Sequence, residues 1–253
     1  MKIKSVNRRI DYVNNLELSV PHESIESLSA TSLNFNEDGP DAKVVGGSTV
    51  SFVGGVPKLI MQDVLNSTLL AQLAANKAYD RETETKLWYY KYREVLENIG
   101  WVIQEFSFSN QSSSGVTVKL DKVALNILKA AMSGNELLVL KATLDALENA
   151  DSGSKEVTLF DHNGSSGDGG NFQLSTASLD PNGNVQMSLG AFHFQASTSH
   201  TRFLFFSWDT QNINIYGGAQ SVILNEQIYA TVRAAINTKL GDKAQKYVAD
   251  IDI

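Results

Sequence analysis

The feature that most constrains the fold is a dense aromatic segment in the last quarter of the chain. Residues 201–218 read TRFLFFSWDTQNINIYGG, so five large apolar side chains fall within six positions. In an extended strand, successive side chains point to opposite faces of the sheet. The segment therefore predicts a central strand covered on both faces, by the core of its own sheet on one side and by amphipathic helices on the other.

Apolar residues that recur about every four positions predict about five helices. The clearest stripe consists of Met61, Leu65, Leu69 and Leu73. Gly100 and Gly241 are typical helix stops, and Ser133 with Glu136 forms a capping-box pattern. The predicted helices begin after Pro57, before Trp88, at Asp121 as N-cap, at Ser133 and at Asn225.

Period-two alternation predicts strands in three parts of the chain. The predicted strands contain Leu16 to Val20, Val50 and Phe52, residues 101–109 (with Gln104 and Phe106) in a hairpin with 115–120, Val157 and Leu159, Phe172 and Leu174, Val185 to Leu189, and 246–253. Pro181-Asn182-Gly183 predicts a hairpin turn, Gly190 a bulge, and Gly217-Gly218 a turn.

These patterns predict a single α+β domain over residues 1–253, with antiparallel sheet packed against the helices. It is subdivided into strands and loops (1–57), helices plus a hairpin (58–150), and a β-meander with a helix and a terminal strand (151–253). A chain of 253 residues with 42% hydrophobic residues can bury a substantial core.

Charge and cysteine content exclude several classes of protein. The net charge is −7, which repels nucleic-acid phosphates, so no nucleic-acid partner is expected. Cysteine is absent, which removes thiolate catalysis and zinc-thiolate sites. With no long apolar run and no signal-peptide pattern, a soluble protein made in the cytoplasm is expected. Release by a specialised route is left open.

The loop LFDHNGSSGDGGNF offers Asp161 and His162 as candidate metal ligands or hydrolytic groups. It fails the EF-hand pattern, because Ser166 and Phe172 stand where glycine and glutamate are required. It fails the G-x-S-x-G pattern because Asp168 replaces the second glycine. A solvated hairpin loop is the favoured interpretation.

His200 and Asp209 are the other pair that a hydrolase could use. His193 lies between Phe192 and Phe194, so on a strand it faces away from both and is expected to be structural. The sequence predicts no cofactor and no metal site, and favours a protein that is not an enzyme.

The segment KLWYYKYRE is the candidate interaction surface. It places Trp88, Tyr89, Tyr90, Lys91 and Arg93 on one helix. Part of this set is expected to belong to the core, with a tyrosine-rich shoulder available for a protein or membrane contact.

The favoured hypothesis is a non-enzymatic bacterial effector or toxin-like virulence protein that contacts a host partner or, conditionally, a membrane. A self-assembling structural protein that forms ordered homo-oligomers is the alternative. An unrecognised hydrolase is the second alternative.

Overall fold

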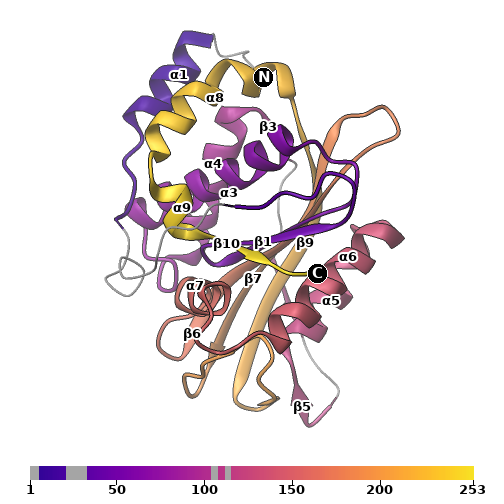
Figure 1. The fold of residues 1–253 in the computed structure, drawn as a ribbon. Coiled ribbons are helices and arrows are strands. Elements are labelled where there is room, and N and C mark those ends of the chain that lie inside the picture. Colours follow the sequence, from indigo (N-terminus) through magenta and orange to yellow (C-terminus); the bar gives the residue numbers. More distant parts are fainter. Residues whose placement is uncertain (1–5, 21–32, 104–107, 112–114) are drawn as a thin grey trace.

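The fold is built around a mixed sheet that lies between two layers of helices (Figure 1). The computed structural model describes residues 6–20, 33–103, 108–111 and 115–253. The predicted α+β class is confirmed. Residues 104 and 106, which were expected in a strand, lie outside the described residues.

The described part of the main sheet has eight strands in the order β10-β1-β2-β6-β7-β9-β3, and β4 also pairs with β9. Their bounds are β1 (Asp41–Val45), β2 (Ser48–Phe52), β3 (Trp101–Val102), β4 (Ser109–Gln111), β6 (Gly169–Leu179), β7 (Val185–Ala196), β9 (Ile213–Leu224) and β10 (Val248–Ile251). A separate two-stranded sheet joins β5 (Thr117–Val118) to β8 (Trp208–Asp209).

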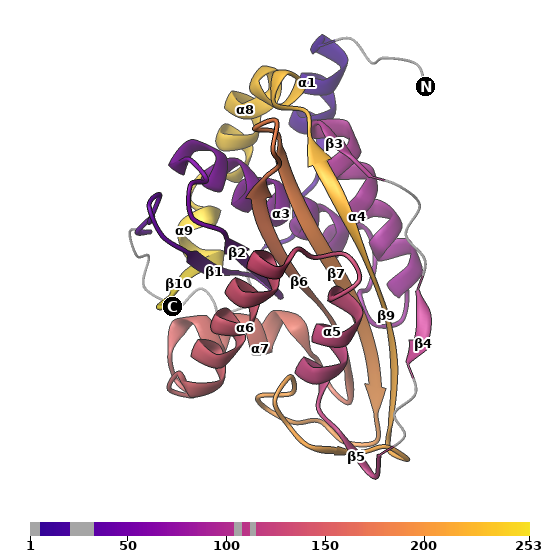
Figure 2. The same ribbon diagram turned by 90° about the vertical axis from the view of Figure 1, so that its right-hand side faces the viewer.

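Three long strands, β6, β7 and β9, form an antiparallel ribbon that runs the length of the molecule (Figure 2). This confirms the predicted meander. At the β6–β7 turn, the Asp180 side chain accepts hydrogen bonds from the backbone nitrogens of Asn182 and Asn184, both at 2.8 Å. Gly183 takes a positive φ of 80°, which glycine adopts without strain. Local turn chemistry therefore sets the register of the longest hairpin.

The sheet is not purely antiparallel as predicted, because β2 pairs with β6 in parallel. The chain leaves β2, builds helices on both sides of the sheet and then returns beside β2. A parallel neighbour requires a long crossover of this kind. The terminal strand β10 pairs with β1, which confirms that the end of the chain is tied into the sheet.

The helices divide between the two faces of the sheet (Figures 1 and 2). One layer contains α1 (Val6–Asn15), α3 (Lys58–Ala78), α4 (Thr85–Ile99), α8 (Glu226–Leu240) and α9 (Lys243–Tyr247). The other contains α5 (Leu120–Leu128), α6 (Gly134–Asn149) and α7 (Lys155–Gly164). The described residues thus form eight helices where about five were expected, since α1, α7 and α9 were not predicted.

Because both faces of the ribbon are covered, apolar residues of both parities are buried on β7. Phe192 and Phe194 face the α5–α7 layer, while Leu189 and Ala191 face α4. The β6–β7 register runs without interruption through Gly190, so the predicted bulge is wrong. A Cβ at Gly190 would meet the Phe192 ring at 2.8 Å, so glycine makes room for that ring.

The segment at Gly217-Gly218 is not a turn, as predicted, but the middle of β9. A Cβ at Gly217 would come within 2.7 Å of the same Phe192 ring. Small residues in a strand interior often mark such a close approach. The glycines therefore reflect packing against Phe192 on the neighbouring strand.

The aromatic segment at 203–208 is also not the predicted central strand. Residues 201–206 form turns, and only Trp208 and Asp209 are extended, as the short strand β8. Phe203 and Leu204 are fully buried, whereas Phe205 and Phe206 are partly buried. The Phe203 ring stacks on Phe160 and on Phe194, at 5.4 and 5.3 Å between centroids. Residues 203–208, which we call the plug, close the end of the core under α7.

Three other elements differ from the sequence prediction. Residues 16–20, expected as a strand, follow α1 and are assigned to neither helix nor strand. Val157 and Leu159 were predicted as a strand but lie on α7, where Phe160 is also buried. The segment at 117–118 pairs with β8, not with 101–109.

Asp121 does not cap α5, because the helix begins one residue earlier with Lys119 as its N-cap. The Asp121 carboxylate instead binds Lys122 Nζ at 2.9 Å. The predicted capping box of α6 is confirmed: Ser133 Oγ accepts from the Glu136 nitrogen, and Glu136 accepts from the Ser133 nitrogen. Asn225 caps α8 as predicted.

Replacement of Phe203 by alanine is expected to cost about 3 to 5 kcal/mol of unfolding free energy, because the ring is fully buried among other rings. Phe206→Ala is the matched control, since Phe206 is only partly buried and should cost about 1 kcal/mol. Urea denaturation of the two variants measures the difference. Equal losses would contradict the plug arrangement.

Ser133→Ala is expected to destabilise the protein by about 1 kcal/mol, because it removes the side-chain acceptor of the α6 capping box. Ser154 is the N-cap of α7 but makes no side-chain capping bond, so Ser154→Ala should change stability by less. Thermal unfolding of both variants checks this contrast. A larger loss for Ser154→Ala would show that the capping geometry is not what stabilises these helices.

Candidate functional site

Asp161 and His162, predicted in a solvated loop, lie on the last turn of α7. Asp161 Oδ2 accepts a hydrogen bond from the Arg202 backbone nitrogen at 2.8 Å. Arg202 has a positive φ of 58°, which is uncommon for a residue with a side chain. Burial raises the pKa of Asp161. This carboxylate therefore holds the start of the 203–208 plug, while His162 is exposed on the surface.

His200 and Asp209 have separate contacts in the part of the chain that the structure describes. The His200 ring stacks on Phe206 at 3.6 Å between centroids. Asp209 Oδ1 accepts from the Gln211 nitrogen at 2.9 Å, a local turn contact. These contacts give each side chain a structural role. The hydrolase stays a hypothesis.

Within the described residues, no group of three or more His, Asp or Glu side chains is placed to hold a metal ion. None of the helices described is long and apolar enough to cross a membrane.

The five residues predicted as an interaction surface point in different directions from α4. Trp88 is fully buried and donates from Nε1 to Asn76 Oδ1 at 2.7 Å, so it belongs to the core. Tyr89 faces the sheet, where its hydroxyl accepts from Gln173 Nε2 at 2.8 Å. Tyr90 is 63% exposed. Lys91 and Arg93 bind Glu94 and Glu97, respectively, on the same helix.

On the sheet side of α4 lies a hollow of about 820 Å³, which we call the α4 groove. One wall is α4 itself, the floor is formed by β7 and β9, and Ile103 and Phe108 contribute from the chain that follows α4. The volume falls within the range of small-molecule pockets. Its lining includes Lys86, Leu87, Tyr90, Arg93, Leu96, Leu189, Ala191, His193, Tyr216 and Gln220.

The floor of the α4 groove is apolar because of strand register. Ala191 pairs with Gly218, and Leu189 pairs with Gln220, so these side chains share the face turned toward α4. Glycine at 218 and alanine at 191 leave space that larger residues would fill. Leu96 on α4 closes the opposite wall.

Two polar side chains lie at the β7–β9 side of the groove. His193 pairs with Tyr216, and their rings stack at 6.2 Å between centroids. Burial lowers the pKa of His193, which favours the uncharged form of its ring. Among the described residues, Gln220 Oε1 is buried without a hydrogen-bond partner. Such an atom is costly to leave unpaired, which makes it a candidate contact for a ligand donor or a water.

The rim of the groove carries exposed apolar side chains next to cations. Leu87 is 46% exposed, Tyr90 63% and Tyr216 38%. Lys86 is exposed and forms no ion pair with any described residue, and Arg93 lies one helical turn beyond Tyr90. The rim is therefore apolar and positively charged, in a chain whose net charge is −7.

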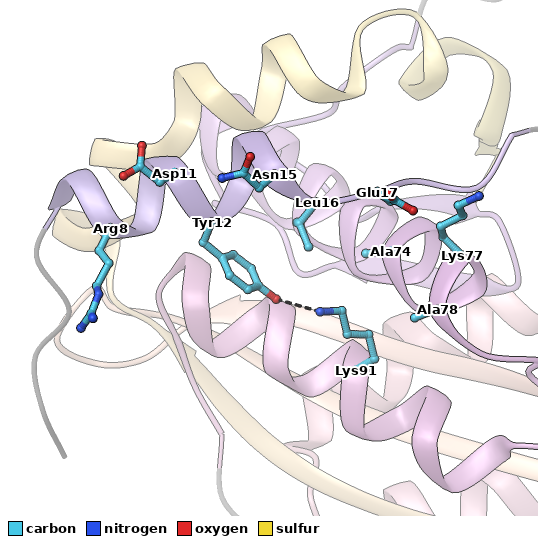
Figure 3. A pocket seen from close by; sticks show the side chains of 10 residues that line it. All are labelled: Arg8, Asp11, Tyr12, Asn15, Leu16, Glu17, Ala74, Lys77, Ala78 and Lys91. Carbon is cyan, nitrogen blue, oxygen red and sulfur yellow. Dashed lines mark hydrogen bonds between the residues drawn. The ribbon is translucent and has the colours of Figure 1, made fainter.

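A second hollow, of about 650 Å³, lies on the other side of α4, between α1 and α3 (Figure 3). In the figure the Tyr12 hydroxyl points toward Lys91, at 3.5 Å from Nζ. Its lining mixes both signs of charge, with Asp11 and Glu17 beside Arg8, Lys77 and Lys91. A lining of mixed charge favours no particular ligand, so the α4 groove is the stronger candidate site.

Sequence reasoning placed one wall of this site and missed its floor. Tyr89, Tyr90 and Arg93 line the α4 groove as predicted residues. His193 was correctly placed opposite Phe192 and Phe194 but taken as structural only. Its neighbours on β9 were not identified, because residues 217–218 were predicted as a turn. No local sequence pattern connects them with α4.

Asp161→Ala is expected to lower the unfolding free energy by about 1 to 3 kcal/mol, because a partly buried backbone donor at Arg202 loses its acceptor. His162→Ala, one residue along the same helix, is the control and should change stability by about 0.5 kcal/mol or less. Chemical denaturation of the two variants makes the comparison. Equal, small effects of the two substitutions would instead support the solvated loop that the sequence predicts for Asp161.

No protein-family model matches the chain, and no curated protein sequence matches it. Among solved structures, "Structure of the Evf virulence factor" is similar at a TM-score of 0.35 and 15% identity, covering 83% of this chain and 84% of that chain. A delta-endotoxin is similar at a TM-score of 0.43 and 14% identity, covering 82% of this chain and 90% of that chain. Both TM-scores are below 0.5, so the likeness is weak and carries no weight for this chain's function.

Proposed function

We propose that this chain is a non-enzymatic protein of effector or toxin type, and that it acts by contact of the α4 groove and its rim with a lipid membrane. The observation that carries the proposal is the rim, where Leu87, Tyr90 and Tyr216 are exposed beside an apolar hollow. Contiguous exposed apolar surface of this kind marks interaction sites.

The chemistry of the rim favours a membrane surface over a protein partner. Tyrosine has an apolar ring and a polar hydroxyl, and it is enriched at the boundary between lipid and water. Lys86 adds a positive charge close to Leu87 and Tyr90, which suits the anionic headgroups of many membranes. The apolar floor gives an inserted acyl chain a place to lie.

Binding to vesicles of phosphatidylcholine with phosphatidylglycerol, measured by flotation, tests this function. The double variant Leu87→Ala with Tyr90→Ala is expected to weaken binding about tenfold, equivalent to ~1.4 kcal/mol. Both side chains are exposed, so the fold should be retained. Leu138→Ala is the matched control, because Leu138 is 65% exposed on α6 in the opposite helical layer.

Three outcomes would contradict the proposal. No flotation of the original chain would reject the membrane as partner. An equal loss for Leu138→Ala would place the contact on another surface. A molar mass from light scattering that rises with protein concentration in the absence of vesicles would favour the alternative of ordered homo-oligomers.

A further inference from the structure

The lining of the α4 groove combines buried apolar side chains with more exposed cationic side chains, which define what we call its buried end and its entrance. Leu96, Leu189 and Ala191 lie at its buried end, with exposed fractions of 5% or less. Lys86 and Arg93 stand at the entrance on α4. A molecule that fills the groove would therefore meet apolar surface at one end and positive charge at the other.

We propose that the α4 groove binds one molecule of an amphiphilic anion, with its apolar body against β7 and β9 and its anionic group between Lys86 and Arg93. The inference rests on the proposed function in taking the α4 groove as the contact surface, and it names the chemistry of the ligand. The hollow of about 820 Å³ is large enough for a molecule of drug size.

The cations at the entrance are available to a ligand. Lys86 forms no ion pair with a described residue. Arg93 shares one contact with Glu97, at 3.2 Å from Nε, which leaves its other guanidinium donors free of any described ion pair. Burying part of the ligand beside them lowers the local dielectric and strengthens the attraction.

The net charge of −7 does not oppose this assignment at close range. Charges farther away than about 8 Å are largely screened at physiological salt. Contact with two cations at the entrance therefore outweighs the distant acidic residues, while Glu97, at 3.2 Å from Arg93 Nε, offsets part of the attraction. Salt should weaken the charged part of the interaction and leave the apolar part.

Polar groups inside the groove restrict the body of the ligand. Gln220 Oε1 is buried without a partner and can accept one hydrogen bond. The His193 ring stacks with Tyr216, and burial lowers its pKa and so favours its uncharged form, so this side offers flat ring surface. A planar or ring-containing body with one donor group fits this lining better than a uniformly polar one.

The experiment uses two fluorescent probes that differ in one substituent, which is charged in one probe and absent from the other. 1-Anilinonaphthalene-8-sulfonate carries a sulfonate, and N-phenyl-1-naphthylamine has the same rings and amine without it. Both are titrated into the folded chain in the absence of lipid. The original chain is expected to bind each probe saturably at one equivalent, the sulfonate more tightly.

Removal of the entrance charges separates the two probes. In Lys86→Gln with Arg93→Gln, affinity for the sulfonate is expected to fall about tenfold, with affinity for the neutral probe unchanged. The matched control is Lys129→Gln with Lys141→Gln, which makes the same change in net charge at exposed lysines of the α5–α6 layer. That control is expected to leave both affinities unchanged.

A filling variant tests the apolar end. Ala191→Leu extends a floor side chain into the groove and is expected to weaken both probes by at least tenfold. Circular dichroism confirms that it is folded, and if it is not, the entrance variants decide alone. Binding at several equivalents, equal losses for the two probes at the entrance variant, or losses in the Lys129 and Lys141 control would each overturn the proposal.

The probe and vesicle measurements fail independently. Vesicle binding that depends on Leu87 and Tyr90, without saturable probe binding in the groove, would keep the proposed function and reject the amphiphile. Saturable probe binding with the expected pattern, without flotation, would keep the amphiphile site and reject the membrane contact.

Discussion

The structure depends on the burial of β6 and β7, two strands of the β6–β7–β9 ribbon, on both of their faces. On the α5–α7 side the ribbon presents phenylalanine rings, and Gly190 and Gly217 admit the ring of Phe192. On the α3–α4 side it is held by a buried hydrogen-bonded chain from Gln72 on α3 through Ser48 and Gln173 to Tyr89 on α4. These hydrogen bonds fix α4 against the ribbon at Tyr89. Elsewhere along α4, small residues on the ribbon leave the space of the α4 groove.

Elements set by nearby residues were predictable from the sequence, and elements set by distant partners were not. The capping box at Ser133 and the hairpin turn at 180–184 use bonds within four residues, so their patterns were sufficient. The aromatic segment at 203–208 looked like a strand because alternation cannot distinguish two covered faces from a buried turn. Its conformation depends on Asp161, which is about forty residues away.

One wall of the candidate site could be predicted from the sequence, through Tyr89, Tyr90 and Arg93. The α4 wall was found because KLWYYKYRE has an unusual concentration of aromatic and basic residues on one helix. The floor was missed because Leu189, Ala191 and Gly218 are unremarkable residues that acquire a role only through the register of β7 with β9. Register between strands is a long-range property, and one sequence carries no direct signal for it.

The parallel pairing of β2 with β6 has a consequence for the order of folding. Ser48 and Gln173, which are bonded to one another, are 125 positions apart, whereas β6 and β7 are joined by a short turn. Closing a long loop costs more conformational entropy before any contact repays it, so the ribbon is expected to assemble first. The β1–β2 hairpin and β10 then add at one edge, and this late edge is where the native sheet is expected to open first.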